Sequence, residues 1–285
     1  MGAAKDADLG SASGSAYVFR RNDGGADGWG QLRKLTASDG AADDEYGKSV
    51  AISGDTVLIG AWHEADAGSD SGAAYVVTLA GCDWTEVDKP VAGDGAADDH
   101  FGLAVALDGD QALIGAPDDD DAGAGSGAAY LFQRNTGGVD TWGQVKKLTA
   151  SDAAAGDSFG TAVALHGDLA VVGAPAGDAG GTADTGTAYV FERNQGGADN
   201  WGEVTELTAS DAALSDAFGT SVALDIDHVV VGAPGDDGAT GAIYVFERNQ
   251  GGSDAWGQVQ KRTAADAAAG DELGAAVGLS LDTIV

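Results

Sequence analysis

A serine flanked by glycines is the first segment whose residue types could do chemistry. Residues 156–160 read GDSFG, which fits the G-x-S-x-G pattern of hydrolases, where the serine lies on a turn between a strand and a helix and attacks a carbonyl carbon. The same column of an internal repeat holds Glu45, His100, Ala217 and Glu272, and no helical pattern follows the segment. We therefore expect no catalysis at Ser158.

Aspartate-rich loops offer a second chemistry, the weak binding of Ca²⁺ by carboxylate oxygens. The candidate ligands are Asp118, Asp120, Asp236 and Asp237. None of them belongs to a complete D-x-D-x-D-G loop with a distal acid, which is the strong calcium signature. The alternative is a solvated acidic loop, so the sequence makes no cofactor certain.

An aromatic and polar group around residue 62 is the third candidate. The segment 60–72 reads GAWHEADAGSDSG, and the candidate ligand-binding residues are Trp62, His63, Glu64 and His100. An exposed tryptophan beside polar groups is a common contact for a sugar or a protein partner. Two histidines with Glu64 and Asp66 could instead hold Zn²⁺. The plainer alternative is that Trp62 only packs on its neighbour.

These candidates lie in a chain that repeats itself. An aromatic-or-leucine residue followed by glycine recurs at intervals of 55 to 59 residues, and a tryptophan recurs in step with it. The first column is Tyr46, Phe101, Phe159, Phe218 and Leu273; the second is Trp29, Trp84, Trp142, Trp201 and Trp256. Such a period is typical of propellers and solenoids. We expect the tryptophans to be packing residues and the glycines to permit close backbone approach.

Each repeat contains four strand-like segments and no sustained helical period. In one repeat these segments are 159–165, 169–174, 187–193 and 201–207, separated by clusters of Gly, Asp and Asn. The second segment is a continuous apolar run, such as AVVGA, which indicates a strand covered on both faces. A four-stranded unit covered on both faces is typical of a propeller blade. The sequence predicts an all-β fold with almost no helix.

The repeated columns also resemble a known family. The FG pair, the GAP triplets at 115–117, 173–175 and 232–234, and the AYVF-like segments are similar to the FG-GAP repeats of integrin-α-type β-propellers, in their bacterial and archaeal form. The resemblance covers the whole chain. It implies a non-catalytic binding or adhesion module of a surface or secreted protein. A structural spacer in a longer array and a propeller hydrolase are the alternatives.

The repeat boundaries predict one propeller of five four-stranded blades over residues 1–285. The units are about 36–91, 92–148, 149–207, 208–262, and 263–285 joined with 1–35. A fragment of a seven-bladed ring is the alternative. In an antiparallel meander, the loop after the second strand and the loop between blades lie on the same face, and these loops hold more than half of the 46 acidic residues. We expect a partner, protein or glycan, to bind this loop face.

The net charge limits the kinds of partner that we expect, and the N-terminal sequence bears on the location of the protein. The formal net charge is −32, which disfavours nucleic acid and anionic membranes and resembles proteins from high-salt environments. The abundance of Asp also suits a turn-rich fold. No apolar run is long enough to span a membrane, no signal peptide is visible, and Cys82 is the single cysteine, so no internal disulfide forms. The resemblance implies an extracellular or cell-surface protein.

Overall fold

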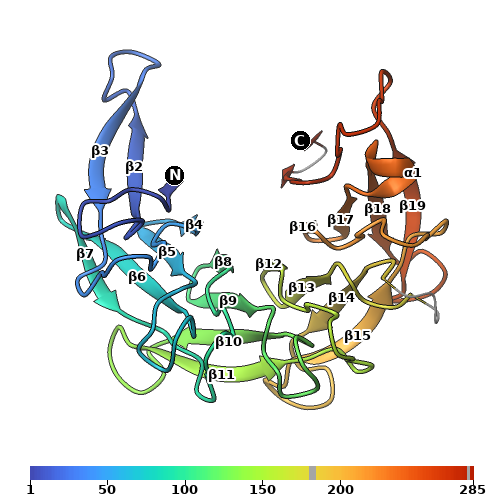
Figure 1. The fold of residues 1–285 in the computed structure, drawn as a ribbon, viewed down its shortest axis with the longest axis horizontal. Coiled ribbons are helices and arrows are strands. Elements are labelled where there is room, and N and C mark those ends of the chain that lie inside the picture. The colour runs from blue at the N-terminus through green and yellow to red at the C-terminus, as the bar shows by residue number, and fades with distance from the viewer. Residues whose placement is uncertain (180–183, 281–282) are drawn as a thin grey trace. The chain divides into compact units, whose positions relative to one another are not determined.

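Antiparallel strands make up nearly all of the regular structure (Figure 1). The computed structural model describes residues 1–179, 184–280 and 283–285. The described residues contain one helical segment, α1 (Asp236–Ala239), which is four residues long and has positive φ at Asp237, Gly238 and Ala239. The all-β prediction is therefore confirmed, and α1 is in effect a tight turn.

The chain forms two compact units. The first comprises Met1–Ile114 and Tyr130–Val145, and the second comprises Gly115–Ala129 and Lys146–Val285. The first unit contains a three-stranded sheet with the order β1-β2-β3 and a four-stranded sheet with the order β4-β5-β6-β7. These strands are β1 (Gly2–Ala3), β2 (Ser15–Arg21), β3 (Trp29–Leu35), β4 (Ser49–Ser53), β5 (Thr56–Ala61), β6 (Ala73–Ala80) and β7 (Asp83–Asp88).

The second unit contains two four-stranded sheets and one two-stranded sheet. Their orders are β12-β13-β14-β15, β16-β17-β18-β19 and β20-β21. The strands are β12 (Ala162–His166), β13 (Leu169–Ala174), β14 (Thr187–Glu192), β15 (Gly202–Leu207), β16 (Ser221–Leu224), β17 (His228–Ala233), β18 (Ala242–Arg248), β19 (Trp256–Arg262), β20 (Leu279–Ser280) and β21 (Thr283–Ile284).

A further four-stranded sheet has the order β11-β10-β9-β8. Its strands are β8 (Ala104–Asp108), β9 (Gln111–Ala116), β10 (Ala128–Arg134) and β11 (Trp142–Leu148). Four repeats thus form complete four-stranded meanders. The remaining described strands form the three-stranded sheet β1-β2-β3 and the two-stranded sheet β20-β21.

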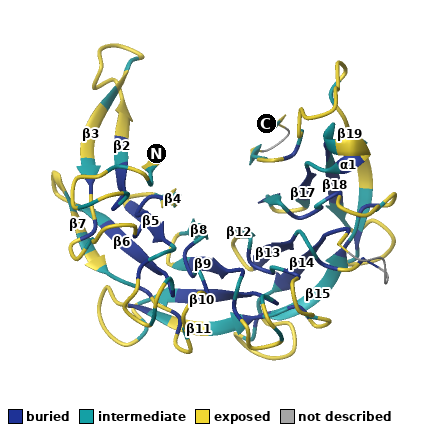
Figure 2. Ribbon diagram, viewed as in Figure 1, coloured by how far each residue is buried: buried dark blue, intermediate teal, exposed yellow. Residues whose placement is uncertain are grey.

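Burial follows the position of a strand within its sheet (Figure 2). All six residues of β5 and of β13 are buried, whereas β7 alternates between exposed and half-buried residues. The continuous apolar runs therefore lie where both faces of the strand are covered, as predicted. Apolar side chains from adjacent repeats share one core, since Val171 of β13 and Val231 of β17 belong to the same cluster.

Close backbone approach explains the glycines of the repeat. A Cβ built on Gly60, the first residue of the GAW triplet, would lie 1.9 Å from the carbonyl oxygen of Gly102 in the next repeat. Gly72, at the start of the third strand, forms a parallel bridge to Phe101, has a φ of 81° and leaves no room for a Cβ. The prediction that the repeat glycines are structural is confirmed at these positions.

Each loop between repeats is closed by an aspartate that was not singled out from the sequence; it is buried in four repeats and exposed at Asp271. Its Oδ2 accepts a hydrogen bond from the backbone N–H three residues earlier, at 2.6 to 2.8 Å. The residues are Asp44, Asp99, Asp157, Asp216 and Asp271. The next residue has a φ of 53° to 56° in all five repeats, and the buried aromatic residue, or Leu273, follows it. This turn sets the direction in which the loop enters the next sheet.

Candidate functional site

Lysine-centred clusters organise the acidic loop face. In the first complete repeat, Lys89 follows β7, and its Nζ lies 2.7 Å from an Asp39 carboxylate oxygen, 3.0 Å from Glu64 and 2.6 Å from Asp66. The ammonium also lies 5.2 Å from the centre of the Tyr75 ring. The Tyr75 hydroxyl donates to Asp39 Oδ1 at 2.8 Å. One cation therefore serves three carboxylates and covers a buried tyrosine.

These contacts control the ionisation of the cluster. Burial alone would raise the pKa of Asp39, but the hydrogen bonds from Lys89 and Tyr75 outweigh it, and the pKa is lowered. Burial also opposes the charge on Lys89, yet the surrounding carboxylates raise the pKa of its ammonium above the usual range. The more enclosed Glu64 behaves differently: burial dominates, and its pKa is raised. The cluster is an internal ion network.

The same arrangement recurs in three other repeats. Lys34, Lys147 and Lys261 take the place of Lys89, and Asp6, Asp119 and Asp236 take that of Glu64; their Nζ-to-oxygen distances are 2.8 to 2.9 Å. This network was not expected from the sequence. The sequence does contain a signal for it. In the same four repeats, a lysine stands five residues after the tryptophan and an acidic residue stands two residues after the GAP triplet or its equivalent.

Lysine thus occupies the positions that a metal ion would need. Among the described residues, one group of three His, Cys, Asp or Glu side chains has ligand atoms close enough together to share an ion, namely Asp39, Glu64 and Asp66. Lys89 already binds all three. Glu64 and Asp66 are therefore turned to Lys89, and the structure does not gather them with the two histidines into the zinc set considered from the sequence.

The calcium candidates lie in two different loops, Asp118 and Asp120 after β9 and Asp236 and Asp237 in α1. Asp120 Oδ1 accepts a turn hydrogen bond from the Gly125 backbone at 2.6 Å. Asp236 is bound by Lys261 and by the Tyr244 hydroxyl, and Asp237 is exposed on the adjacent turn. Asp118 is half-buried. Two of these acids therefore have a structural contact that accounts for their place in the loop.

One repeat breaks the network. Glu206 stands where the other repeats have lysine, and Gly177 stands where they have the acid. A Cβ on Gly177 would lie 2.3 Å from Thr187 Oγ1, so no acid fits there without movement. Glu206 Oε1 is buried without a hydrogen-bond partner among the described residues, and its pKa is raised by burial and by the charges of Asp152 and Glu203.

The residues predicted around position 62 do lie together. We define the Trp62 cluster as Trp62, His63, His100 and Lys48. The ring centres of His63 and His100 lie 4.0 and 4.7 Å from that of Trp62, and 5.3 Å from each other. Lys48 Nζ lies 4.5 Å from the Trp62 ring centre. The loop after β5 supplies the first two residues, and the loops before β4 and β8 supply Lys48 and His100.

Neighbouring carboxylates hold this cluster in position. Trp62 Nε1 donates to Glu45 Oε2 at 3.0 Å, and Lys5 binds the other oxygen of Glu45. Burial works against the charge of Glu45, but these two hydrogen bonds outweigh it and lower its pKa. His63 Nδ1 lies 3.2 Å from Asp70 Oδ1. His63 Nε2 is buried without a hydrogen-bond partner among the described residues.

The exposure of Trp62 differs from the expectation. The sequence predicts an exposed tryptophan, whereas the structure has it half-buried, because both histidines and Lys48 lie against its ring. Glu64, the fourth predicted residue, is buried and belongs to the lysine network instead. The predicted site is therefore reduced to Trp62, His63 and His100 and gains Lys48.

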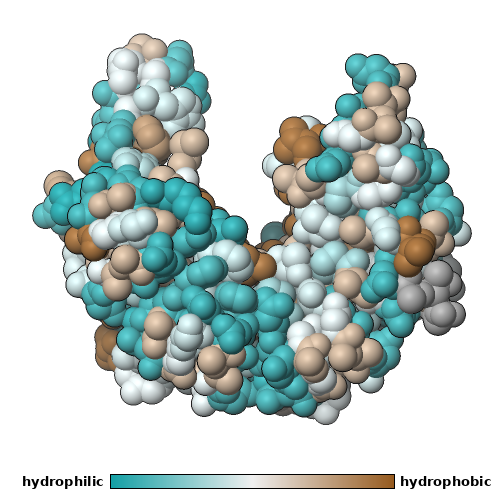
Figure 3. All heavy atoms as spheres, viewed as in Figure 1, coloured by the Kyte–Doolittle hydropathy of each residue, from teal (hydrophilic) through white to brown (hydrophobic). Residues whose placement is uncertain are grey.

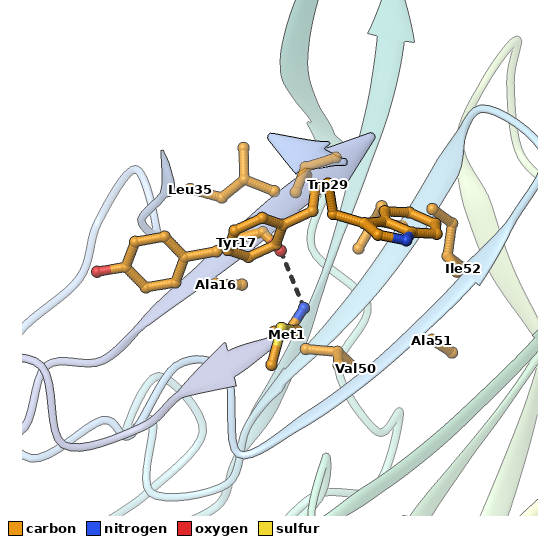
Figure 4. A pocket seen from close by; sticks show the side chains of 11 residues that line it. Met1, Ala16, Tyr17, Trp29, Leu35, Val50, Ala51 and Ile52 are labelled. Carbon is orange, nitrogen blue, oxygen red and sulfur yellow. Dashed lines mark hydrogen bonds between the residues drawn. The ribbon is translucent and has the colours of Figure 1, made fainter. Parts of the chain in front are cut away.

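An apolar hollow lies elsewhere in the first unit (Figure 4). Its volume is about 590 Å³, and it is lined by Met1, Ala16, Tyr17, Val18, Phe19, Trp29, Leu35, Val50, Ala51, Ile52 and Val57. Trp29 is 67 % exposed there, whereas Trp142, Trp201 and Trp256 are at most 9 % exposed. The packing role predicted for the tryptophan column is confirmed for these three. No acid, histidine or cysteine is among the described residues that line the hollow.

The serine of GDSFG lies on a turn that leads into a strand. Ser158 lies in the loop between β11 and β12, with a φ of 56°, and the chain continues into a strand. Its hydroxyl donates to the Gly156 carbonyl at 3.4 Å. The segment joins two strands, β11 and β12, whereas the G-x-S-x-G pattern places its serine between a strand and a helix.

Repeated four-stranded antiparallel meanders define a protein of the β-propeller class. Five segments of the chain match the FG-GAP repeat family, at residues 29–77, 84–132, 142–191, 201–246 and 256–285. The chain belongs to this family. Each matched segment begins at the tryptophan column, and the first four end in the third strand of the following sheet. No match was found among curated proteins.

Proposed function

We propose that this protein is a non-catalytic binding module of a surface or secreted protein, and that its ligand, a glycan or a protein, contacts the Trp62 cluster on the acidic loop face. FG-GAP repeats occur typically in extracellular proteins. No described helix is long and apolar enough to cross a membrane. On the face drawn in Figure 3, hydrophobic residues form only small scattered patches, which suits a partner that reads polar loops.

One observation carries this proposal: several departures from the repeat meet at one place. Trp62 replaces the proline of three other repeats, and Lys48 replaces Leu103, Thr161, Thr220 and Ala275. His63 and His100 also differ from the residues in their columns. Drift in a repeat has no reason to select residues that contact one another. Aromatic and histidine side chains grouped in this way offer apolar area together with polar atoms.

The proposal is tested by returning the site to the repeat consensus. Trp62→Pro restores the residue found at the same position in three repeats, so the fold should persist, and His63→Ala removes one imidazole. Ligands are first identified with a glycan array and a pull-down using the intact protein in about 1 M KCl, where surface charges are strongly screened. We expect each variant to weaken binding of the identified ligand at least tenfold, by titration calorimetry.

His166→Ala provides the matched control. His166 is an exposed histidine at the end of β12, outside the Trp62 cluster. This variant should bind like the original protein. Unchanged binding in both Trp62→Pro and His63→Ala, with the circular dichroism spectrum intact, would falsify the proposed site.

A further inference from the structure

Lys48 has an unusual position in this protein. The chain has 14 basic residues among 46 acidic ones, and most of the basic side chains bind a carboxylate. Lys48 is exposed and forms no ion pair among the described residues; its ammonium instead lies over the Trp62 ring. The acidic loop face therefore carries an exposed ammonium beside an aromatic ring, and this ammonium can form an ion pair with a ligand.

The surroundings of Lys48 combine two kinds of recognition. The indole and imidazole rings of Trp62, His63 and His100 offer faces and edges of the kind on which a sugar ring lies. The ring nitrogens of histidine donate or accept hydrogen bonds, and an ammonium donates up to three. His63 Nδ1 lies 3.2 Å from Asp70 Oδ1, which helps to hold this imidazole beside Trp62.

Taken together, these features point to a ligand that is both cyclic and negatively charged. Resting on the function proposed above, we propose that the Trp62 cluster binds an acidic sugar: a uronic-acid residue whose ring lies against Trp62 and whose carboxylate pairs with Lys48 Nζ. A charge-assisted hydrogen bond of this kind is stronger than a neutral one and favours the uronate over the matching neutral sugar.

The net charge of the chain determines the salt concentration at which an acidic sugar can bind. A net charge of −32 repels a polyanionic glycan over a distance set by the screening length. That length is about 10 Å at 0.1 M salt and about 3 Å at 1 M. In about 1 M KCl the repulsion from remote carboxylates is largely removed, whereas a carboxylate in contact with Lys48 keeps its hydrogen bond.

The experiment compares charged and neutral ligands of the same shape. Short oligomers of galacturonate, mannuronate and glucuronate are titrated into the full chain in about 1 M KCl, each beside its carboxyl-reduced counterpart. We expect at least one uronate oligomer to bind about fivefold or more tightly than its reduced counterpart, as one exposed charge-assisted contact implies. Lys48→Gln, which keeps most of the side chain, should abolish that preference by weakening the binding of the uronate oligomer.

The outcomes separate this inference from the proposed function. Equal binding of charged and reduced oligomers, absence of uronate binding, or a preference that survives Lys48→Gln overturns the acidic-sugar assignment. In each of these cases the proposed binding function is still supported if Trp62→Pro weakens the binding of another identified ligand, such as an acidic peptide. Preserved uronate binding in Trp62→Pro would instead remove the Trp62 cluster from both proposals.

Discussion

At the scale of single residues, one lysine in each of four repeats reduces the repulsion between the carboxylates of the acidic loop face. Each of four lysines forms ion pairs with two or three carboxylates, and its single positive charge offsets part of their negative charge. The lysines are Lys34, Lys89, Lys147 and Lys261. Surface ion pairs contribute little singly, but a shared cation among several acids forms a network. Glu206 lacks this cation and adds a further negative charge near Asp152 and Glu203.

We therefore expect Glu206→Gln and Glu206→Lys to stabilise the protein at pH 7, by about 1 kcal/mol for the first. The pKa of Glu206 is raised in the folded state, so its ionisation costs stability as the pH rises through the interval between its ordinary pKa and the raised one. The gain should be present at pH 7 and absent near pH 3, where the carboxyl is protonated in both states. Chemical denaturation at the two pH values measures this.

Glu247→Gln and Glu247→Lys are the matched controls, because they change the net charge by the same amount at a glutamate on β18 whose carboxylate accepts a hydrogen bond from Gln250. They should change the free energy of unfolding at pH 7 by less than the Glu206 variants. Equal effects at the two positions would show that total charge matters and the local cluster does not.

At the scale of elements, adjacent repeats are held together by backbone contacts that leave no space for a side chain. The loop glycine of one repeat and the GAP-column glycine of the previous repeat lie in direct contact, as Gly102 and Gly60 illustrate. Phe101 enters the buried space beside Tyr130 at a ring distance of 5.5 Å. The registration of neighbouring sheets therefore depends on glycine as much as on the apolar core.

Gly60→Ala tests this contact. The new Cβ would lie 1.9 Å from the Gly102 carbonyl oxygen, and only movement of backbone relieves that overlap. We expect a loss of about 2–3 kcal/mol in the free energy of unfolding. Gly138→Ala, in an exposed hairpin loop where the nearest atoms belong to the Thr141 side chain, should change it by less than about 1 kcal/mol. A mild Gly60→Ala variant, measured by denaturant titration, would contradict the role given to this contact.

At the scale of the whole molecule, the excess of acidic residues dominates. The lysine network and the other ion pairs engage most of the 14 basic residues, yet the net charge remains −32. Like charges repel through the solvent, and this repulsion destabilises the compact state. Salt weakens both the pairs and the repulsion, but the unpaired charges outnumber the pairs.

We therefore expect the Tm to rise between about 0.05 M and 1 M KCl, since the screening length falls from above 10 Å to about 3 Å. Sucrose at matched osmolality is the control for effects other than screening. Replacing several unpaired loop aspartates by asparagine should reduce the salt dependence. A Tm that does not change over this range of KCl would contradict the prediction.

The sequence by itself determined the repeat, the all-β class, the burial of the second strand and the structural role of the glycines, because each follows from a local period or a column that recurs. It also placed Trp62, His63 and His100 in one site, since the alternation of loops in an antiparallel meander depends only on strand order. Only the tertiary structure shows which side chains contact one another. Glu64 turns to Lys89, Trp62 is covered by Lys48, and Glu206 has no cation, because these contacts join loops far apart in the chain, and their geometry depends on how the sheets pack.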